Sequence, residues 1–219
     1  MKYALIIFDL DGTSLNTLDD LCFACNQALI LNGYPTKSRE YIRCSVGSGL
    51  TSLIQKVLPD PVDEKTSTKI LRDFKSIYAE HLNDQTHPYD GIPQLMTDLK
   101  KANIRIAIHS NKIDSAVKTL CTMHFPNMVD MVLGEKPEFG KKPSPSGVKH
   151  IMENLGVSPD LTLYVGDSEV DIQTALNAGV DCAWVSWGFR SRGELGDLTP
   201  PNAFDSVESL RQYLFEAQA

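Results

Sequence analysis

The 219-residue sequence is poor in basic charge and in long apolar runs. Its net charge of −7 at pH 7 argues against nucleic acid as a partner, because phosphate backbones attract basic surfaces. Every apolar run stays below the length of about 18 residues that a membrane-spanning helix needs, so we expect no membrane partner. The sequence also lacks internal repeats and low-complexity segments. These absences leave an ordinary globular protein as the class to consider.

Cysteine is scarce as well, with five residues at scattered positions. The odd number and the scatter do not suggest a disulfide framework. Cys22 and Cys25 have the C-x-x-C spacing of metal and redox sites, but no second pair accompanies them, and they occupy an amphipathic helical pattern. We therefore predict two buried helical thiols. No signal peptide pattern opens the chain, because Asp9 and Asp11 follow a short apolar run, so we expect a cytoplasmic, reduced protein.

What the sequence does contain is an alternation of short apolar runs with helical patterns. The runs predict buried parallel strands at 3–8, 104–108 and 161–165, with further candidates at 182–187 and 128–134. Strands that alternate with helices predict an α/β fold with a doubly wound, Rossmann-like parallel sheet. The length allows one full domain and a smaller one.

Residues 16–85 interrupt this alternation. Two helical patterns follow one another there without a strand between them, and the first ends at Asn32 and Gly33, a good helix stop. We predict a catalytic α/β core formed by residues 1–15 and 86–219. We predict that residues 16–85 form a small inserted α-helical cap domain.

Polar residues follow each of the central strands. In an open α/β sheet, ligands bind outside the carboxyl ends of the strands, so these residues are the candidates for chemistry. They are Asp9, Asp11, Gly12 and Thr13 after the first strand, His109, Ser110, Asn111 and Lys112 after the second, and Gly166, Asp167, Ser168 and Asp171 after the third.

The aspartates in this set predict a metal site. Asp9 and Asp11 start on one face of an extended chain, and Asp167 and Asp171 share a helix face, although helix-terminal acids stabilised by the dipole are an alternative for Asp171. Acids that converge at one edge need a cation, and hard oxygen ligands with few histidines indicate Mg²⁺. Lys142, directly before Pro143, is the basic residue we expect beside them.

Four motifs in order resemble those of the haloacid dehalogenase-like phosphatases. They are DLDGT at 9–13, SN at 110–111, KPSP at 142–145 and GDSEVD at 166–171, and they span nearly the whole chain. The resemblance implies that Asp9 is a nucleophile that forms an aspartyl-phosphate. It implies that Asp11 is the general acid and base. Ser110 would bind a phosphoryl oxygen, and Lys142 would offset negative charge.

The same resemblance implies the remaining ligands. Mg²⁺ would be held by the Asp9 carboxylate, the Asp11 backbone carbonyl and Asp167, with Asp171 supporting it through water or an outer contact. Gly12, Thr13 and Asn111 would contact the substrate. An aspartate at position 11 favours a phosphatase over a dehalogenase, and the alternative of another class is a phospho-accepting, receiver-like binding module. Most relatives have a leucine and an acidic residue where this chain has Ser14 and Asn16. These two residues lie in the turn that leads into the cap, so we expect the difference to affect substrate contacts or cap movement.

The substrate is expected to be a small phosphorylated metabolite. VGSGLTSLIQKVL at 46–58 resembles a loop and helix of phosphoglycolate phosphatases, in which the backbone N–H groups of Gly47, Ser48 and Gly49 can meet an anion. A flexible helix start is the alternative. Arg43 and Arg192 are the available partners for a substrate carboxylate. Another small phosphoester, pyrophosphate or a β-phosphoglucomutase-like phosphotransfer remain alternatives, and the sequence does not indicate an oligomeric state.

Overall fold

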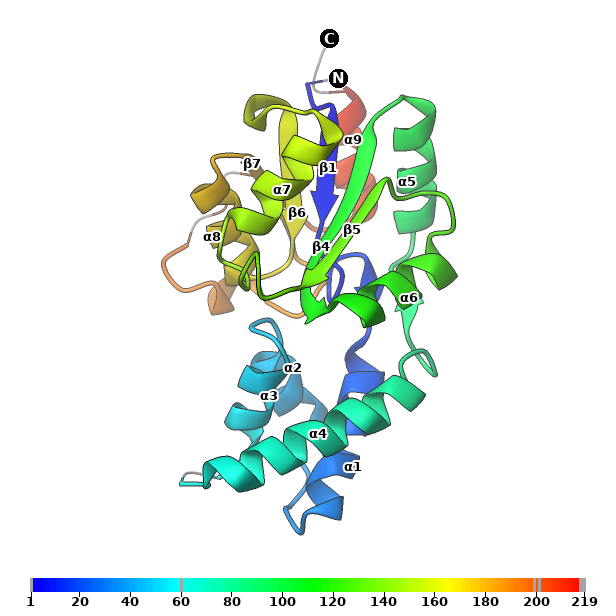
Figure 1. Ribbon diagram of the computed structural model, residues 1–219. Helices are drawn as coiled ribbons and strands as arrows, with labels where there is room; N and C mark the ends of the chain where they lie inside the picture. Colours follow the sequence, from blue (N-terminus) through cyan, green and yellow to red (C-terminus); the bar gives the residue numbers. More distant parts are fainter. Residues whose placement is uncertain (1, 60, 199, 201, 217–219) are drawn as a thin grey trace.

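A six-stranded parallel sheet organises the larger part of the molecule (Figure 1). The computed structural model describes residues 2–59, 61–198, 200 and 202–216. Across these residues the strand order is β5-β4-β1-β6-β7-β8, which confirms the predicted α/β, doubly wound sheet. The strands are β1 (Leu5–Phe8), β4 (Arg105–Ile113), β5 (Met131–Glu135), β6 (Thr162–Gly166), β7 (Asp181–Val185) and β8 (Asn202–Phe204).

Helices cover both faces of this sheet, because successive side chains of a buried strand point to opposite sides. On β1, Ile6 and Phe8 pack into one apolar cluster and Leu5 and Ile7 into another, all of them fully buried. The first cluster includes side chains of α5 (Ile92–Lys101), α6 (Asp114–His124) and α9 (Val207–Glu216), and the second those of α7 (Ser146–Leu155) and α8 (Glu169–Ala178). The 3₁₀ turns are η1 (Pro159–Leu161) and η2 (Arg192–Glu194).

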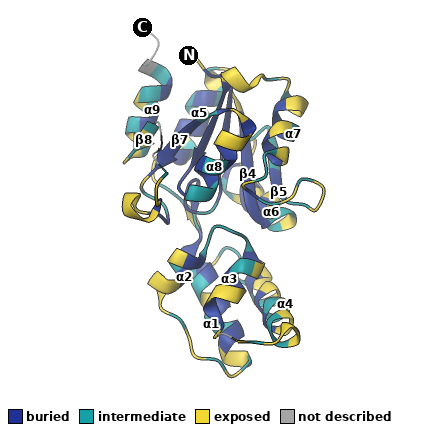
Figure 2. Ribbon diagram, turned by 90° about the vertical axis from the view of Figure 1, so that its left-hand side faces the viewer, coloured by how far each residue is buried: buried dark blue, intermediate teal, exposed yellow. Residues whose placement is uncertain are grey.

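A group of helices lies below the sheet in Figure 1, and we call it the helical lobe (residues 18–80). It consists of α1 (Leu18–Leu31), α2 (Arg39–Ser45), α3 (Leu50–Val57) and α4 (Glu64–Glu80). These helices enclose an apolar cluster of their own, which includes Leu21, Ile42 and Phe74. Figure 2 shows the buried stripes of the lobe facing inward and the exposed residues on its outside. Residues 1, 60, 199, 201 and 217–219, which the predicted domain ranges include, lie outside the described residues.

Two chain segments join the lobe to the sheet. The short strands β2 (Leu15–Asn16) and β3 (His87–Pro88) pair in antiparallel fashion. Next to them, the buried carboxylate of Asp20 accepts hydrogen bonds of 2.7 to 3.1 Å from the backbone of Gln85 and from the backbone and hydroxyl of Thr86. Asp20 therefore fastens the first lobe helix to the segment that returns to the sheet.

The predicted helical thiols lie on α1. Cys25 is buried as predicted, whereas Cys22 is half-buried. Burial raises the pKa of Cys25 to about 12 and that of Cys22 to about 11, so both are held as thiols at neutral pH. In the described part of the chain, no helix has both the length and the apolar character to cross a membrane.

Candidate active site

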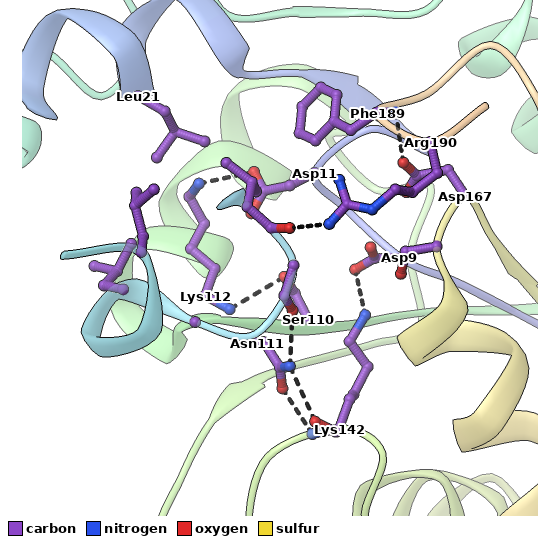
Figure 3. A pocket seen from close by; sticks show the side chains of 16 residues that line it. Asp9, Asp11, Leu21, Ser110, Asn111, Lys112, Lys142, Asp167, Phe189 and Arg190 are labelled. Carbon is purple, nitrogen blue, oxygen red and sulfur yellow. Dashed lines mark hydrogen bonds and ion pairs between the residues drawn. The ribbon is translucent and has the colours of Figure 1, made fainter. Parts of the chain in front are cut away.

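A cavity opens where β1, β4 and β6 end and the helical lobe faces the sheet (Figure 3). The space open to the centre of a water molecule is about 40 Å³. Predicted site residues that line it are Asp9, Asp11, Ser110, Asn111, Lys142, Asp167, Gly47 and Gly49, and the other lining residues are Leu21, Val46, Leu50, Leu53, Lys112, Ser168, Phe189 and Arg190. Acidic and basic side chains therefore line the cavity at the sheet, and apolar side chains line it at the lobe.

Asp9 follows β1 and is 6% exposed. Its Oδ1 lies 2.8 Å from Lys142 Nζ, and the same ammonium donates to Asp171 Oδ1 at 2.7 Å. Burial raises the pKa of Asp9 well above its usual range, Asp171 and Asp167 raise it further, and Lys142 opposes the rise. Apart from this ion pair with Lys142, Oδ1 has no hydrogen-bond partner among the residues that the structure describes. Asp9 is thus a buried carboxylate that one lysine holds within a group of acids.

Asp167 lies at the end of β6, opposite Asp9. Its Oδ1 accepts a hydrogen bond from Thr13 Oγ1 at 3.1 Å, and its Oδ2 accepts one from the backbone N–H of Phe189 at 2.6 Å. Burial and the nearby Asp171 raise the pKa of Asp167 to about 7. A Cβ atom on Gly12, whose φ is +88°, would lie 2.5 Å from Asp167 Oδ2. Gly12 and Thr13 therefore shape and hold the Asp167 carboxylate, and neither lines the cavity.

Asp171 is fully buried in the first turn of α8. Its Oδ2 accepts hydrogen bonds from the backbone N–H of Ser168 at 3.1 Å and from the Ser168 hydroxyl at 2.6 Å. Its Oδ1 accepts a hydrogen bond from Lys142 Nζ at 2.7 Å. Asp171 thus combines the helix-terminal role with a second one, which is to hold the lysine ammonium beside Asp9.

Three of the predicted acids form a group that can hold a metal ion. Oxygen atoms of Asp9, Asp167 and Asp171 lie within 4.8 Å of one another. All three carboxylates are buried, and the ammonium of Lys142 pairs with two of them, Asp9 and Asp171. Hard oxygen donors in this arrangement fit a divalent cation, which would also relieve the repulsion among the acids.

Asp11 faces the junction of the core and the lobe. Its Oδ1 accepts hydrogen bonds from Thr17 Oγ1 at 2.6 Å and from Lys112 Nζ at 2.8 Å. The Lys112 ammonium also lies 4.7 Å from the ring centre of Tyr78 on α4. In the sequence, Lys112 is one of the polar residues after the second predicted strand, and its position there predicts no specific role. The structure makes it the buried cation of Asp11.

Ser110 and Asn111 lie within β4 and both are buried. Ser110 lines the cavity between Asp11 and Lys142 in Figure 3. The Asn111 amide accepts a hydrogen bond from the backbone N–H of Lys142 at 2.7 Å and donates to Lys142 O at 3.2 Å and to Gly47 O at 3.0 Å. Asn111 therefore positions the backbone of the lysine and touches the lobe.

The remaining predicted residues divide between the cavity and its surroundings. Ser48 does not line the cavity, although Gly47 and Gly49 do. Arg43 and Arg192, the two arginines suggested for a substrate carboxylate, lie outside the cavity lining. Arg190 lies inside it instead. Arg190 follows β7 just as the other site residues follow their strands, and this was the signal that could have identified it.

Comparisons with known proteins agree with one another. A family model described as haloacid dehalogenase-like hydrolase matches residues 6–185. The phosphoglycolate phosphatase of Aquifex aeolicus is 31% identical to this chain, over 97% of the chain and 99% of the relative. That of Vibrio parahaemolyticus is 32% identical, over 94% and 93%.

Solved structures give the same result. A crystal structure from Lactobacillus delbrueckii subsp. bulgaricus, described as a candidate phosphoglycolate phosphatase, superposes with a TM-score of 0.93 at 34% identity. The match covers 98% of this chain and 99% of that one. A predicted phosphoglycolate phosphatase from Haemophilus somnus gives 0.90 at 26% identity, with 100% and 99% covered.

Proposed function

The chain belongs to the haloacid dehalogenase-like hydrolases, and from this membership and its site geometry we propose a Mg²⁺-dependent phosphatase with phosphoglycolate as the preferred substrate. The chain is an enzyme that hydrolyses phosphoric monoesters, as do the relatives named phosphoglycolate phosphatase. The observation that carries the finer proposal is the Asp9 carboxylate. It is buried, it pairs with Lys142, it lies in one group with Asp167 and Asp171, and it lines the cavity.

In the proposed reaction, Asp9 attacks the phosphorus atom of the ester and forms an aspartyl-phosphate. The bond from phosphorus to the alcohol oxygen breaks, and the alkoxide takes a proton from Asp11. Both hydrogen bonds to Asp11 fall on Oδ1, which leaves Oδ2 for the proton transfer. Asp11 then removes a proton from the water that attacks the aspartyl-phosphate, and inorganic phosphate leaves with Asp9 and Asp11 restored.

The other cavity residues position and balance charge. The Ser110 hydroxyl donates to a phosphoryl oxygen, and Lys142, fixed by Asp171, offsets charge on the nucleophile and on the transferring group. We propose that Asp9, the Asp11 backbone carbonyl and Asp167 bind Mg²⁺, with Asp171 in support. When bound, the metal orients the phosphoryl group and neutralises its charge.

The size of the cavity favours a small ester. The space open to water centres is only about 40 Å³. We propose that residues 16–85 act as a cap domain that opens to admit the substrate and closes to exclude bulk water. The apolar roof of Leu21, Leu50 and Leu53 leaves little room for a large leaving group.

The test is a panel of small phosphate esters and pyrophosphate, ranked by kcat/KM with Mg²⁺ and with EDTA. We expect phosphoglycolate to rank first, EDTA to remove activity, and Asp9→Asn to abolish turnover. Asp160→Asn, a change at an exposed aspartate of η1, is the matched control and should leave activity unchanged.

Each other outcome points elsewhere. A different ester or pyrophosphate at the top of the ranking would replace phosphoglycolate as the substrate. Phosphate moved within a sugar phosphate without release would indicate a phosphotransferase. Stable phosphorylation without release of phosphate would indicate a receiver-like module. Wild-type turnover in Asp9→Asn on every ester would remove Asp9 from the role of nucleophile.

A further inference from the structure

Arg190 connects the core to the helical lobe through the lobe's backbone. It is 6% exposed, and its two terminal nitrogens donate to Arg43 O at 3.0 Å and to Val46 O at 2.6 Å. Its Nε donates to Glu169 at 3.1 Å. Both carbonyls belong to the end of α2 and the residue that follows it. Carbonyls at a helix carboxyl end lack partners in the helix and attract a cation.

Arg43 of the lobe reaches back to the core beside Arg190. Its guanidinium donates to the carbonyl of Phe189, the residue directly before Arg190, and to the carboxylate of Glu194 at 2.7 and 3.1 Å. Each arginine therefore donates to a backbone carbonyl of the other's segment. We call this reciprocal contact, formed by Arg43, Phe189, Arg190 and Glu194, the arginine clasp.

The clasp lies next to the loop that roofs the cavity. Val46, Gly47 and Gly49 of this loop line the cavity, and Val46 is held directly by Arg190. The neighbouring carbonyl of Gly47 accepts a hydrogen bond from Asn111. Two core side chains, Arg190 and Asn111, thus hold the backbone carbonyls of residues 46 and 47, so the position of this loop above the acidic cluster depends on these donors.

We propose that Arg190 is a positioning residue that holds loop 46–49 over the acidic cluster and, through the arginine clasp, keeps the helical lobe closed on the core. This inference rests on the proposed phosphatase function for its kinetic consequences, but its structural content is independent of the substrate. Each terminal nitrogen of Arg190 already donates to a lobe carbonyl, and Nε is occupied by Glu169. The side chain of Arg190 is therefore hydrogen-bonded to the lobe before any substrate enters.

Two substitutions at Arg190 test the proposal. Arg190→Gln removes both bonds to the lobe, and we expect kcat/KM for the best ester to fall about tenfold or more, chiefly through KM. Inhibition by inorganic phosphate should weaken by a similar factor. Small-angle X-ray scattering of the substrate-free protein should show a larger radius of gyration. Arg190→Lys keeps the charge and should recover part of the loss.

Arg192→Gln is the matched control. Arg192 is an exposed arginine two residues along the same loop, outside the cavity lining, and its replacement should change neither KM nor scattering. If Arg190→Gln does not fold, Glu194→Gln weakens the other arm of the clasp and leaves Arg190 in place. That variant should show changes of the same kind in KM and in the radius of gyration, but smaller ones.

A double-mutant cycle of Arg43→Gln and Arg190→Gln separates one clasp from two unrelated contacts. The proposal predicts that the double variant loses less than the sum of the single losses, because either break frees the lobe. Additive losses, or unchanged KM and scattering in Arg190→Gln, would overturn it. A loss confined to carboxylate-bearing esters, without change in scattering, would make Arg190 a substrate-binding residue instead. If the wild type hydrolyses no ester, the proposed function fails while scattering still tests the clasp.

Discussion

Replacing Asp167 with asparagine should make the metal-free protein less sensitive to pH. The folded-state pKa of Asp167 is about 7, against an ordinary value of 3.8. Between these values the folded state binds more protons than the unfolded state, so stability falls as pH rises from about 4 to about 7. The full difference corresponds to at most about 4 kcal/mol.

The asparagine variant keeps the local contacts but cannot ionise. Its amide oxygen can accept from the backbone N–H of Phe189, and its amide nitrogen can donate to the Thr13 hydroxyl, which now accepts. We therefore expect the free energy of unfolding of the variant to rise relative to that of the wild type as pH increases. Above about pH 7 the variant should be the more stable protein.

Denaturant unfolding in EDTA from about pH 4 to about pH 8 measures this effect. Addition of Mg²⁺ should raise the free energy of unfolding of the wild type at pH 8 and barely that of Asp167→Asn, because the variant lacks the ligand. Asp160→Asn serves as the exposed control. A constant difference between wild type and Asp167→Asn across the whole pH range would refute the reasoning, and so would equal stabilisation of both by Mg²⁺.

Three further variants test other parts of the site and its support. Asp11→Asn should slow or trap the aspartyl-phosphate in rapid-quench experiments, and a normal burst and turnover would contradict the acid and base role. Lys112→Met removes the buried cation of Asp11 and should lower the free energy of unfolding by about 3 kcal/mol, with an unchanged denaturation midpoint as the contrary result. Asp20→Ala leaves the backbone N–H groups of Gln85 and of the buried Thr86 without their acceptor and should cost about 2 to 4 kcal/mol in the same assay, whereas a wild-type value would show that the link between lobe and sheet is unimportant.

The sheet could be predicted from the sequence because its central strands are buried on both faces and so read as apolar runs. The run at 3–8 contains β1, and that at 161–165 overlaps β6. The prediction was incomplete at the edges. β8 has only three residues, Asn202–Phe204, and none is fully buried, so no apolar run marks it. β4 extends to Ile113 beyond the predicted 108, because its polar end continues to pair with β5 after an irregularity in register.

The residues of the candidate site could be predicted from the sequence where their position at the end of a strand was sufficient to place them. The structure brings Asp9, Ser110, Lys142 and Asp167 to one cavity. Three of them were predicted from strand ends that topology directs to the same edge, and Lys142 was predicted from its place at a helix entrance. The partners of these groups were less accessible. The contact of Asp171 with Lys142 joins residues 29 positions apart, and no local pattern encodes it.

The basic residues at the lobe show the same limit. Arg43 and Arg190 look alike in sequence, but Arg190 lines the cavity and Arg43 pairs outside it with Glu194. Which way each side chain points depends on how the lobe meets the core, and that is decided by contacts such as the Asp20 anchor and the arginine clasp. Spacing along the chain places Arg190 in the loop after β7, but it does not give the direction of either side chain.

The most direct test of the central claim is detection of phosphate on Asp9 during turnover. The protein is mixed with Mg²⁺ and excess phosphoglycolate, quenched in acid within the first turnovers, and analysed by peptide mass spectrometry. The account predicts a phosphoryl group on the peptide that contains Asp9, formed as fast as the first turnover and absent in Asp9→Asn. Rapid release of phosphate with no phosphorylated Asp9 peptide at any time would contradict it.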